Sequence, residues 1–389
     1  MKTDFKRIPL KEFLDYKTMY YDKIDFSIVK NSFEILKSKI TLPYIIHIVG
    51  TNGKGSTGRF LALYLKSIGK DTLHYSSPHI KDFNERIWIN GKDVTNLELE
   101  KSHKFLQDIL DIYLLEKLTY FEYTTLLAFY LSSNRDYIIL EAGLGGEFDA
   151  TNVAFNNLSL ITTIDLDHQS FLGNSIKEIA LTKMRSCDSV MIIGDQIHDE
   201  VYSHAEIIKE QRYIKLFSLD EFLIDVSSLE NYFPKYLLKN IRLVIATLNY
   251  LDIKVDVDKF KNMKLKGRCE KYKDNITLDV GHNPLAARSI YEEFKDKKVN
   301  LIYNSYADKD YKEVLKILKP IIKKLYILPL DDKRVVKKAD LINVCDNLNI
   351  ISELFKNEIL KSEDYLVFGS FLVIEKFLKI EKSIDENIK

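Results

Sequence analysis

The sequence predicts an α/β protein of two domains, each built on a mostly parallel sheet. Short apolar runs typical of buried strands alternate with longer amphipathic segments typical of helices. The 389 residues exceed the usual size of one domain. A basic stretch that contains a glycine, at 261–268, interrupts the alternation, which then restarts. We therefore expect a first domain over 1–265 and a smaller second domain over 266–389.

The first domain contains five strand-like runs, at 44–49, 72–76, 137–140, 158–164 and 190–193. Apolar residues recur every three or four positions at 97–118 and 176–184, which is the spacing of a helix. The chain is polar between 196 and 234, and we expect it to be irregular there. A helix is expected at 240–251.

The second domain repeats the pattern on a smaller scale. Its expected elements are strand 276–280, helix 284–294, strand 299–303, helix 311–318, strand 325–328, strand 365–368 and helix 371–380. Parallel sheets of this kind bind ligands at the carboxyl ends of their strands. Because the polar residues considered below follow directly after apolar runs, the sequence places function at these ends.

Composition excludes several classes of protein. Basic and acidic residues number 57 each, so no overall charge favours a nucleic acid partner. No apolar run approaches the ~18–20 residues that span a bilayer, and the N-terminus does not resemble a secretory signal. Cys187, Cys269 and Cys345 lie far apart, which fits a reducing compartment better than a metal or disulfide framework. We expect a cytoplasmic monomer without nucleic acid or membrane partners.

The most informative segment is 44–57, where an apolar strand runs into a turn with three glycines, a lysine and hydroxyl residues, followed by a helical pattern. Glycine-freed backbone N–H groups, the charge of Lys54 and the helix N-terminus together form a phosphate site. The strict Walker A pattern is not met, because Ile48 stands where its first glycine belongs and Gly55 follows the lysine. A glycine-rich turn without a ligand is the alternative interpretation.

An acid follows the strand-like run at 137–140. Glu141 ends this run, and three glycines follow it within five residues. A carboxylate in this place resembles the acidic metal partner of a phosphate loop, and the glycines permit close approach of the backbone to a ligand. The segments 75–79 and 84–86, taken alone, indicate only a loop after a strand.

A histidine and a lysine follow the next run. His168 comes after two acids, a setting for a ligand to a metal or to its water, although a single histidine is more often structural. Lys183 lies in the helical pattern at 176–184, and on local grounds it would be a solvated lysine.

The second domain opens with a polar turn. Asp279 ends a strand, and His282 and Asn283 precede a helix that begins at Pro284. This arrangement favours contact with a nucleotide or phosphate, and a capped strand-to-helix turn explains it equally well.

Together these segments resemble the Mur ligase superfamily, and within it the folylpolyglutamate synthase/dihydrofolate synthase family. The resemblance extends from Gly50 to about Phe371, and it rests on the number and order of the matching blocks. These blocks are 50–57, 76–79, 84–86, 149–152, 166–168, 267–268, 278–284, 308–310 and 368–371. The resemblance implies a P-loop-containing, Mur-ligase-like first domain and a smaller, Rossmann-like α/β second domain that closes over the nucleotide and binds glutamate.

The resemblance implies an ATP-dependent ligase that adds L-glutamate to dihydropteroate, to folate or its polyglutamates, or to both. ATP and Mg²⁺ are the implied cofactors, with K⁺ as a candidate activator. The nucleotide is assigned to Gly50, Thr51, Asn52, Gly53, Lys54, Gly55, Ser56, Thr57, Asn240, Arg268, Asp279 and His282. Magnesium is assigned to Ser77, Glu141 and His168, and the pterin end of the substrate to Thr119, Phe121, Asp149 and Ala150. The implied catalytic residues are Lys54, His168 and Lys183.

The position of Lys183 is that of a lysine which the family carbamylates with CO₂, creating an extra carboxylate near the metal. Two departures from the family pattern lie nearby. The family often has an arginine where this chain has Glu147, and the segment 182–185 reads Thr-Lys-Met-Arg in place of the common Glu-Lys-Ala-Gly.

The chemistry of amide formation supports the same reaction class. A carboxylate does not condense with an amine unaided, because hydroxide is a poor leaving group. Phosphoryl transfer from ATP gives an acyl phosphate, which the amine of glutamate can attack. Both steps build negative charge, which calls for Lys54, magnesium and inward-facing N–H groups.

Two alternatives remain at this point. A Mur-type ligase for a peptidoglycan precursor usually has an extra N-terminal domain, and the 49 residues before Gly50 are too few for one. A P-loop ATPase without ligase activity would leave Glu141, His168 and Asp279 without a role. The sequence does not distinguish addition of the first glutamate from extension of a chain.

Overall fold

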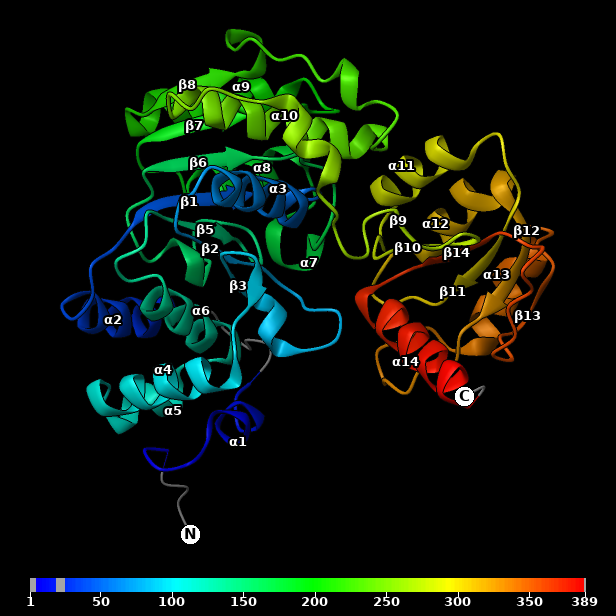
Figure 1. Ribbon diagram of the computed structural model, residues 1–389, viewed down its shortest axis with the longest axis horizontal. Helices are drawn as coiled ribbons and strands as arrows, with labels where there is room; N and C mark the ends of the chain where they lie inside the picture. Colours follow the sequence, from blue (N-terminus) through cyan, green and yellow to red (C-terminus); the bar gives the residue numbers. More distant parts are fainter. Residues whose placement is uncertain (1–4, 19–24, 388–389) are drawn as a thin grey trace. The chain divides into compact units, whose positions relative to one another are not determined.

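The computed structural model describes residues 5–18 and 25–387. The chain forms two compact units, each with its own sheet (Figure 1). The first unit comprises Met1–Glu230 and Leu237–Met263, and the second comprises Asn231–Tyr236 and Lys264–Lys389. The short segment Asn231–Tyr236 was not separated by the sequence analysis. It joins the second unit through the hydroxyl of Tyr236, which donates a hydrogen bond to a carboxylate of that unit.

The first unit is built on an eight-stranded sheet with the order β4-β3-β2-β5-β1-β6-β7-β8. Six strands are parallel, and β3 and β4 extend one edge in antiparallel orientation. The strands are β1 (Tyr44–Val49), β2 (Thr72–Tyr75), β3 (Ile87–Ile89), β4 (Lys92–Asp93), β5 (Tyr137–Glu141), β6 (Leu158–Ile161), β7 (Val190–Ile193) and β8 (Lys215–Ser218). The central strands are apolar and buried, as expected of a sheet covered on both faces.

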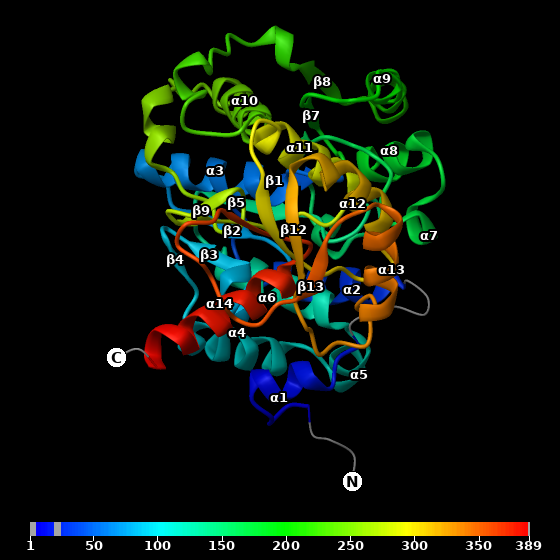
Figure 2. The same cartoon turned by 90° about the vertical axis from the view of Figure 1, so that its right-hand side faces the viewer.

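Helices cover both faces of this sheet. They are α1 (Leu10–Asp15), α2 (Phe26–Lys37), α3 (Lys54–Ser67), α4 (Asn96–Ile109), α5 (Ile112–Lys117), α6 (Tyr120–Leu131), α7 (Gln169–Leu172), α8 (Ile176–Met184), α9 (Glu200–Arg212) and α10 (Lys235–Tyr250). Figure 2 shows α3 and α10 on one side of the strands and α8 and α9 on the other. A short 3₁₀ turn, η2 (Ala150–Asn152), lies against α6.

Several expectations for this unit were wrong in detail, and the helix expected at 240–251 spans Lys235–Tyr250. The segment 97–118 forms two helices, because Asp111 caps a new helix by accepting a hydrogen bond from the amide of Leu114. The region 196–234 is not irregular throughout. It contains α9, whose buried positions Val201, Ala205 and Ile208 follow helical spacing, and the edge strand β8. Strand β6 ends at Ile161, before the expected 164.

The second unit has a six-stranded sheet with the order β13-β12-β11-β14-β10-β9, in which only β9 is antiparallel to its neighbour among the pairs of described residues. Its strands are β9 (Glu270–Lys273), β10 (Ile276–Asp279), β11 (Val299–Tyr303), β12 (Ile322–Ile327), β13 (Ser352–Leu354) and β14 (Tyr365–Phe368). Its helices are α11 (Pro284–Phe294), α12 (Tyr311–Leu318), α13 (Lys338–Asn347) and α14 (Phe371–Asn387). Figures 1 and 2 show α11, α12 and α13 grouped apart from α14.

The predicted α/β class with mostly parallel sheets is therefore confirmed in both units. Glu141 is the last residue of β5 and Asp279 is the last residue of β10, so both carboxylates stand at the carboxyl edges of their sheets. Within the described part of the chain, no helix is long and apolar enough to cross a bilayer.

Candidate functional site

The glycine-rich loop after β1 leads directly into α3. Gly53 is the N-cap of this helix and has a φ of 94°, in the left-handed region that favours glycine. A Cβ at Gly53 would lie 2.5 Å from Oδ1 of Asn240, so α10 packs closely on the loop. The structure thus brings Asn240 to the loop, and its contact with the nucleotide stays a prediction.

The loop does not offer all of its N–H groups to a ligand. The amides of Thr51 and Asn52 both donate to the carbonyl of Thr163, at 2.9 and 3.2 Å. The hydroxyl of Thr51 donates to the carbonyl of Asp165 at 2.8 Å. These residues therefore fasten the loop to the chain that follows β6, and the amides of the first turn of α3 are the ones left outside the helical ladder.

The ammonium of Lys54 lies on its own loop. Its Nζ donates to the carbonyls of Gly50 and Thr51, at 3.0 and 3.2 Å. Backbone carbonyls are weak partners for a full positive charge compared with an oxyanion. The ammonium is therefore held beside the loop by weak hydrogen bonds, which phosphate oxygens of a ligand can replace.

Glu141 and Ser77 meet beside the same loop. The carboxylate of Glu141 accepts a hydrogen bond from the amide of Ser77 at 3.2 Å. A Cβ at Gly55 would lie 3.1 Å from Oε2 of Glu141, so the absence of a side chain at Gly55 leaves room for this carboxylate. A carboxylate and a hydroxyl residue beside a phosphate loop are the hard oxygen donors that Mg²⁺ prefers. These residues fit the implied metal.

His168 lies farther along the loop after β6 than the sequence suggested. It is exposed, has a φ of 52° and precedes the short helix α7. Among the described residues, no three His, Cys, Asp or Glu side chains gather as a metal site. The predicted set has only two such residues, Glu141 and His168, so any metal held there needs further oxygen ligands from hydroxyls or from a bound phosphate.

Lys183 is buried, contrary to its local interpretation as a solvated lysine. Burial and the nearby charge of Lys54 lower its pKa to about 7, against the opposing effect of Asp167 and Asp149. Lys54, Asp167 and Asp149 thus all act electrostatically on Lys183. A substantial fraction of Lys183 is a neutral, nucleophilic amine near pH 7.

The residues assigned to the pterin end meet around the glycine turn after β5. A Cβ at Gly143 would lie 2.7 Å from Cζ of Phe121. Thr119 is the N-cap of α6 and exchanges hydrogen bonds with Glu122 in a capping box. Ala150 is buried in η2, which packs on α6. Three elements thus converge at this place.

Asp149 organises that turn. It is buried, and it accepts hydrogen bonds from the amide of Leu144 at 2.8 Å and from the amide and hydroxyl of Thr151 at 3.0 and 2.5 Å. Burial raises its pKa, and these donors oppose that shift. The two departures from the family pattern also meet here, because Nη1 of Arg185 lies 3.5 Å from Oε2 of Glu147.

In the second unit, several hydrogen-bond donors surround the carboxylate of Asp279. Oδ2 of this buried carboxylate accepts from the hydroxyl of Tyr236 and the amide of Cys269, both at 2.8 Å, and Oδ1 accepts from the amide of Gly281 at 2.7 Å. Burial raises the pKa of Asp279, and the charge of Arg268 opposes this.

Two more of the assigned residues belong to this group. The guanidinium of Arg268 lies over the ring of Phe371 at 5.2 Å. His282 places its Nδ1 3.2 Å from the carbonyl of Val280. Arg268, Asp279 and His282 thus all lie at the carboxyl edge of β10.

Sequence reasoning missed three residues that hold these carboxylates. Tyr236 stands four residues before Asn240, and that spacing on one helix could have singled it out. Thr151 lies inside a matching block but was not selected. His47 is a polar residue in an apolar strand, and its Nε2 lies 2.8 Å from Oγ1 of Thr151.

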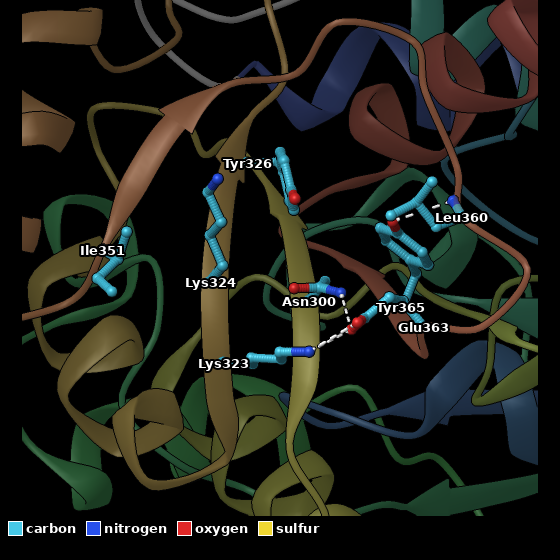
Figure 3. Close-up of a pocket in the computed structure, with 8 residues that line it drawn as sticks. All are labelled: Asn300, Lys323, Lys324, Tyr326, Ile351, Leu360, Glu363 and Tyr365. Carbon is cyan, nitrogen blue, oxygen red and sulfur yellow. Dashed lines mark hydrogen bonds and ion pairs between the residues drawn. The ribbon is translucent and has the colours of Figure 1, made fainter.

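A cavity of about 320 Å³ on the sheet of the second unit is lined by none of these residues (Figure 3). Its polar lining is paired internally: Nζ of Lys323 and Nδ2 of Asn300 both donate to the carboxylate of Glu363. The hydroxyl of Tyr365 accepts from the amide of Leu360. With these groups satisfied, the cavity gives no reason to place the chemistry there.

Comparisons with known proteins address the fold and the family of the chain. No family model matches the chain. The dihydrofolate synthase/folylpolyglutamate synthase of Buchnera aphidicola subsp. Schizaphis graminum is 33% identical over 397 residues, covering 90% of this chain and 93% of that protein.

Two solved structures are similar along nearly the whole chain. The crystal structure of Helicobacter pylori folylpolyglutamate synthetase is 38% identical, with a TM-score of 0.78 and coverage of 96% of this chain and 98% of that one. The structure of Escherichia coli FolC in complex with DHPP and ADP is 25% identical, with a TM-score of 0.82 and full coverage of both chains. With this extent of identity and coverage, the chain belongs to the dihydrofolate synthase/folylpolyglutamate synthase family of ATP-dependent ligases.

Proposed function

We propose that this chain joins L-glutamate to the carboxyl group of dihydropteroate, of a folate that already carries glutamate, or of both, through an acyl phosphate. The observation that carries the proposal is the convergence of Lys54, Lys183, Glu141 and Asp149 at one edge of the first sheet. Lysine and carboxylate side chains gathered at one edge of a sheet suit a reaction that moves a phosphoryl group onto a carboxylate. The family assignment decides against a peptidoglycan ligase and a simple ATPase.

Each group has a separate task in this proposal. Lys54 and the first-turn amides of α3 bind the phosphates of ATP. Glu141, Ser77 and His168 hold Mg²⁺, which when bound supplies positive charge to the transferring phosphoryl group. The pterin end lies at Thr119, Phe121, Asp149 and Ala150.

Lys183 has the properties that carbamylation needs. A neutral amine adds to CO₂, the new N–C bond forms, and one amine proton leaves to solvent. The pKa of about 7 supplies that neutral amine at physiological pH. The resulting carbamate is an anion, and it would replace the repulsion between Lys183 and Lys54 by an attraction.

The second domain has a proposed role in closure. Arg268, Asp279 and His282 contact the nucleotide, and the domain closes over it and binds glutamate, which excludes the water that would hydrolyse the acyl phosphate. Small-angle scattering with ATP and a folate should show compaction, and unchanged dimensions would contradict closure. The enzyme is proposed to act as a cytoplasmic monomer on small molecules alone, and its mass in solution tests the oligomeric state.

The decisive test is the substrate dependence of phosphate release. Release from ATP should require both L-glutamate and a pteroate or folate acceptor. Release that ignored both would contradict a ligase. Product analysis with dihydropteroate and tetrahydrofolate offered separately then shows whether the first glutamate, further glutamates or both are added.

A further inference from the structure

A chain of three side chains runs from the central strand β1 to the pterin-end site. Nε2 of His47 lies 2.8 Å from Oγ1 of Thr151, and this hydroxyl donates to Oδ1 of Asp149 at 2.5 Å. His47 and Thr151 are fully buried, and Asp149 is 6% exposed. The chain therefore runs through the interior, where hydrogen bonds hold their partners most firmly.

With Asp149 ionised, the proton count fixes the directions of these hydrogen bonds. A threonine hydroxyl has one proton, and it is given to Asp149. The contact with His47 must then be made by a proton on Nε2. Burial lowers the pKa of His47 to about 3, so the ring is neutral and carries no proton on Nδ1.

The other nitrogen of the ring favours the same arrangement. Nδ1 of His47 has no hydrogen-bond partner among the described side chains and backbone groups. A proton there would be a buried donor without an acceptor, which is rarer in proteins than an unpaired acceptor. Reversing the directions of these two hydrogen bonds would need a proton on Nδ1 of His47 and a protonated Asp149.

We propose that His47, acting through Thr151, is a positioning residue that holds Asp149 as an ionised carboxylate that only accepts hydrogen bonds. Asp149 then selects a substrate edge that presents N–H donors, as the ring of a pterin does. Of the described titratable groups, Lys183 of α8 and Tyr75 of β2 also interact electrostatically with Asp149. This inference rests on the proposed function, because it takes Asp149 to contact the pterin end.

The kinetic test compares Thr151→Val with Thr151→Ser. Valine keeps the shape and removes the hydroxyl, so KM for the pteroate or folate should rise about tenfold while KM for ATP changes less than twofold. The acidic limb of kcat/KM for that acceptor should move up by about one pH unit, because Asp149 loses a donor. Serine keeps the hydroxyl and should restore both values.

Thr247→Val is the matched control. Thr247 is also buried in the first unit, but its hydroxyl donates to the carbonyl of Leu243 in its own helix. This variant should leave KM and the pH limb unchanged. If Thr151→Val lowered the melting temperature and moved neither KM nor the pH limb, Thr151 would be a packing residue and the proposal would be wrong.

A second measurement does not depend on activity or on a fragile variant. In protein with ¹⁵N-labelled histidine, the signal lost in His47→Gln identifies His47. It should show the neutral form with the proton on Nε2 from pH 5 to pH 9. A proton on Nδ1, or titration in this range, would overturn the chain of hydrogen bonds. If wild-type protein used no pteroate or folate, the proposed function would be wrong. The spectrum would still test the hydrogen bonds from His47 through Thr151 to Asp149.

Discussion

The carboxyl edges of the two sheets hold buried charge in different ways. In the first unit, Lys54 and Lys183 are close enough for one charge to lower the pKa of the other amine. In the second unit, Asp279 is surrounded by three hydrogen-bond donors and by the charge of Arg268. The first edge places two lysines where they repel each other, and the second edge surrounds one carboxylate with donors and a cation.

This difference says which edge gains most from a ligand. An anion placed between two lysines removes a repulsion as well as adding an attraction. A carboxylate that is already paired gains less, but it is held in one orientation before any ligand arrives. We infer that the first edge supplies binding energy for phosphate. The second edge holds its carboxylate in a fixed orientation toward a ligand. The predictions below test that division.

The largest effect is expected from Lys54→Ala. Removing the ammonium takes away the point charge on the transferring phosphoryl group, so turnover should fall at least about a thousandfold. The fold should be unaffected, because within the described part of the chain Lys54 donates hydrogen bonds only to carbonyls of its own loop. Steady-state phosphate release measures the loss, and Lys66→Ala, an exposed lysine of the same helix, is the control. Normal turnover in Lys54→Ala would refute the phosphate site.

Gly55→Ala should have the next largest effect. The new Cβ would lie 3.1 Å from Oε2 of Glu141, so the carboxylate must shift away from the loop. We expect kcat to fall about tenfold to a hundredfold and the Mg²⁺ concentration for half-maximal rate to rise. The free energy of unfolding should be unchanged or slightly larger, because alanine favours a helix by up to about 1 kcal/mol over glycine. If the Mg²⁺ dependence were unaltered, Glu141 would not be a ligand of the metal.

Much of the fold could be predicted from the sequence because local periodicity is strong in its central elements. The bounds of β1, β7, α8, α11 and β14 coincide with the predicted ranges. Edge elements were missed because their polarity resembles that of a loop. β8, for example, has an exposed lysine and three half-buried residues, and it is recognisable as a strand only from its pairing with β7.

The site could be predicted only as a set of residues, without its internal bonding. That Gly55 makes room for Glu141 depends on two distant segments meeting at one edge. The use of the Thr51 and Asn52 amides to fasten the loop, and the burial of Lys183, likewise follow from tertiary packing. Local sequence carries no record of these contacts, so the roles of the assigned residues stay predictions.

Tyr236→Phe tests the balance of the second edge. The variant keeps the ring and removes one of the donors to Asp279. Loss of a hydrogen bond to a charged group is expected to lower kcat/KM for ATP about tenfold, mainly at low pH, because the pKa of Asp279 rises. A pH series of initial rates measures this, with Tyr291→Phe on α11 as the control. An equal loss at every pH would mean that Tyr236 acts only through packing.

The smallest expected effect is a pH dependence of the free energy of unfolding, caused by Lys183 at the first edge. The pKa of Lys183 is lowered in the folded state, so above about pH 7 the unfolded chain binds more protons than the folded one. Stability should therefore increase by about 1 kcal/mol between pH 7 and pH 8 and continue to rise toward the ordinary lysine pKa. Well below pH 7 the buried ammonium destabilises the folded state by a constant amount, so this group adds no pH dependence there.

Urea unfolding followed by tryptophan fluorescence isolates this contribution. The chain has one tryptophan, Trp88 in β3, so the signal reports the first unit. Lys183→Met keeps the length of the side chain and removes the titration, and the difference between wild type and variant cancels other groups, such as Lys17 with its lowered pKa of about 8. Phosphate added at pH 7 should stabilise wild type more than Lys54→Ala, because the anion relieves the lysine repulsion only where both lysines are present. Equal stabilisation would mean that the first edge, like the second, is already balanced.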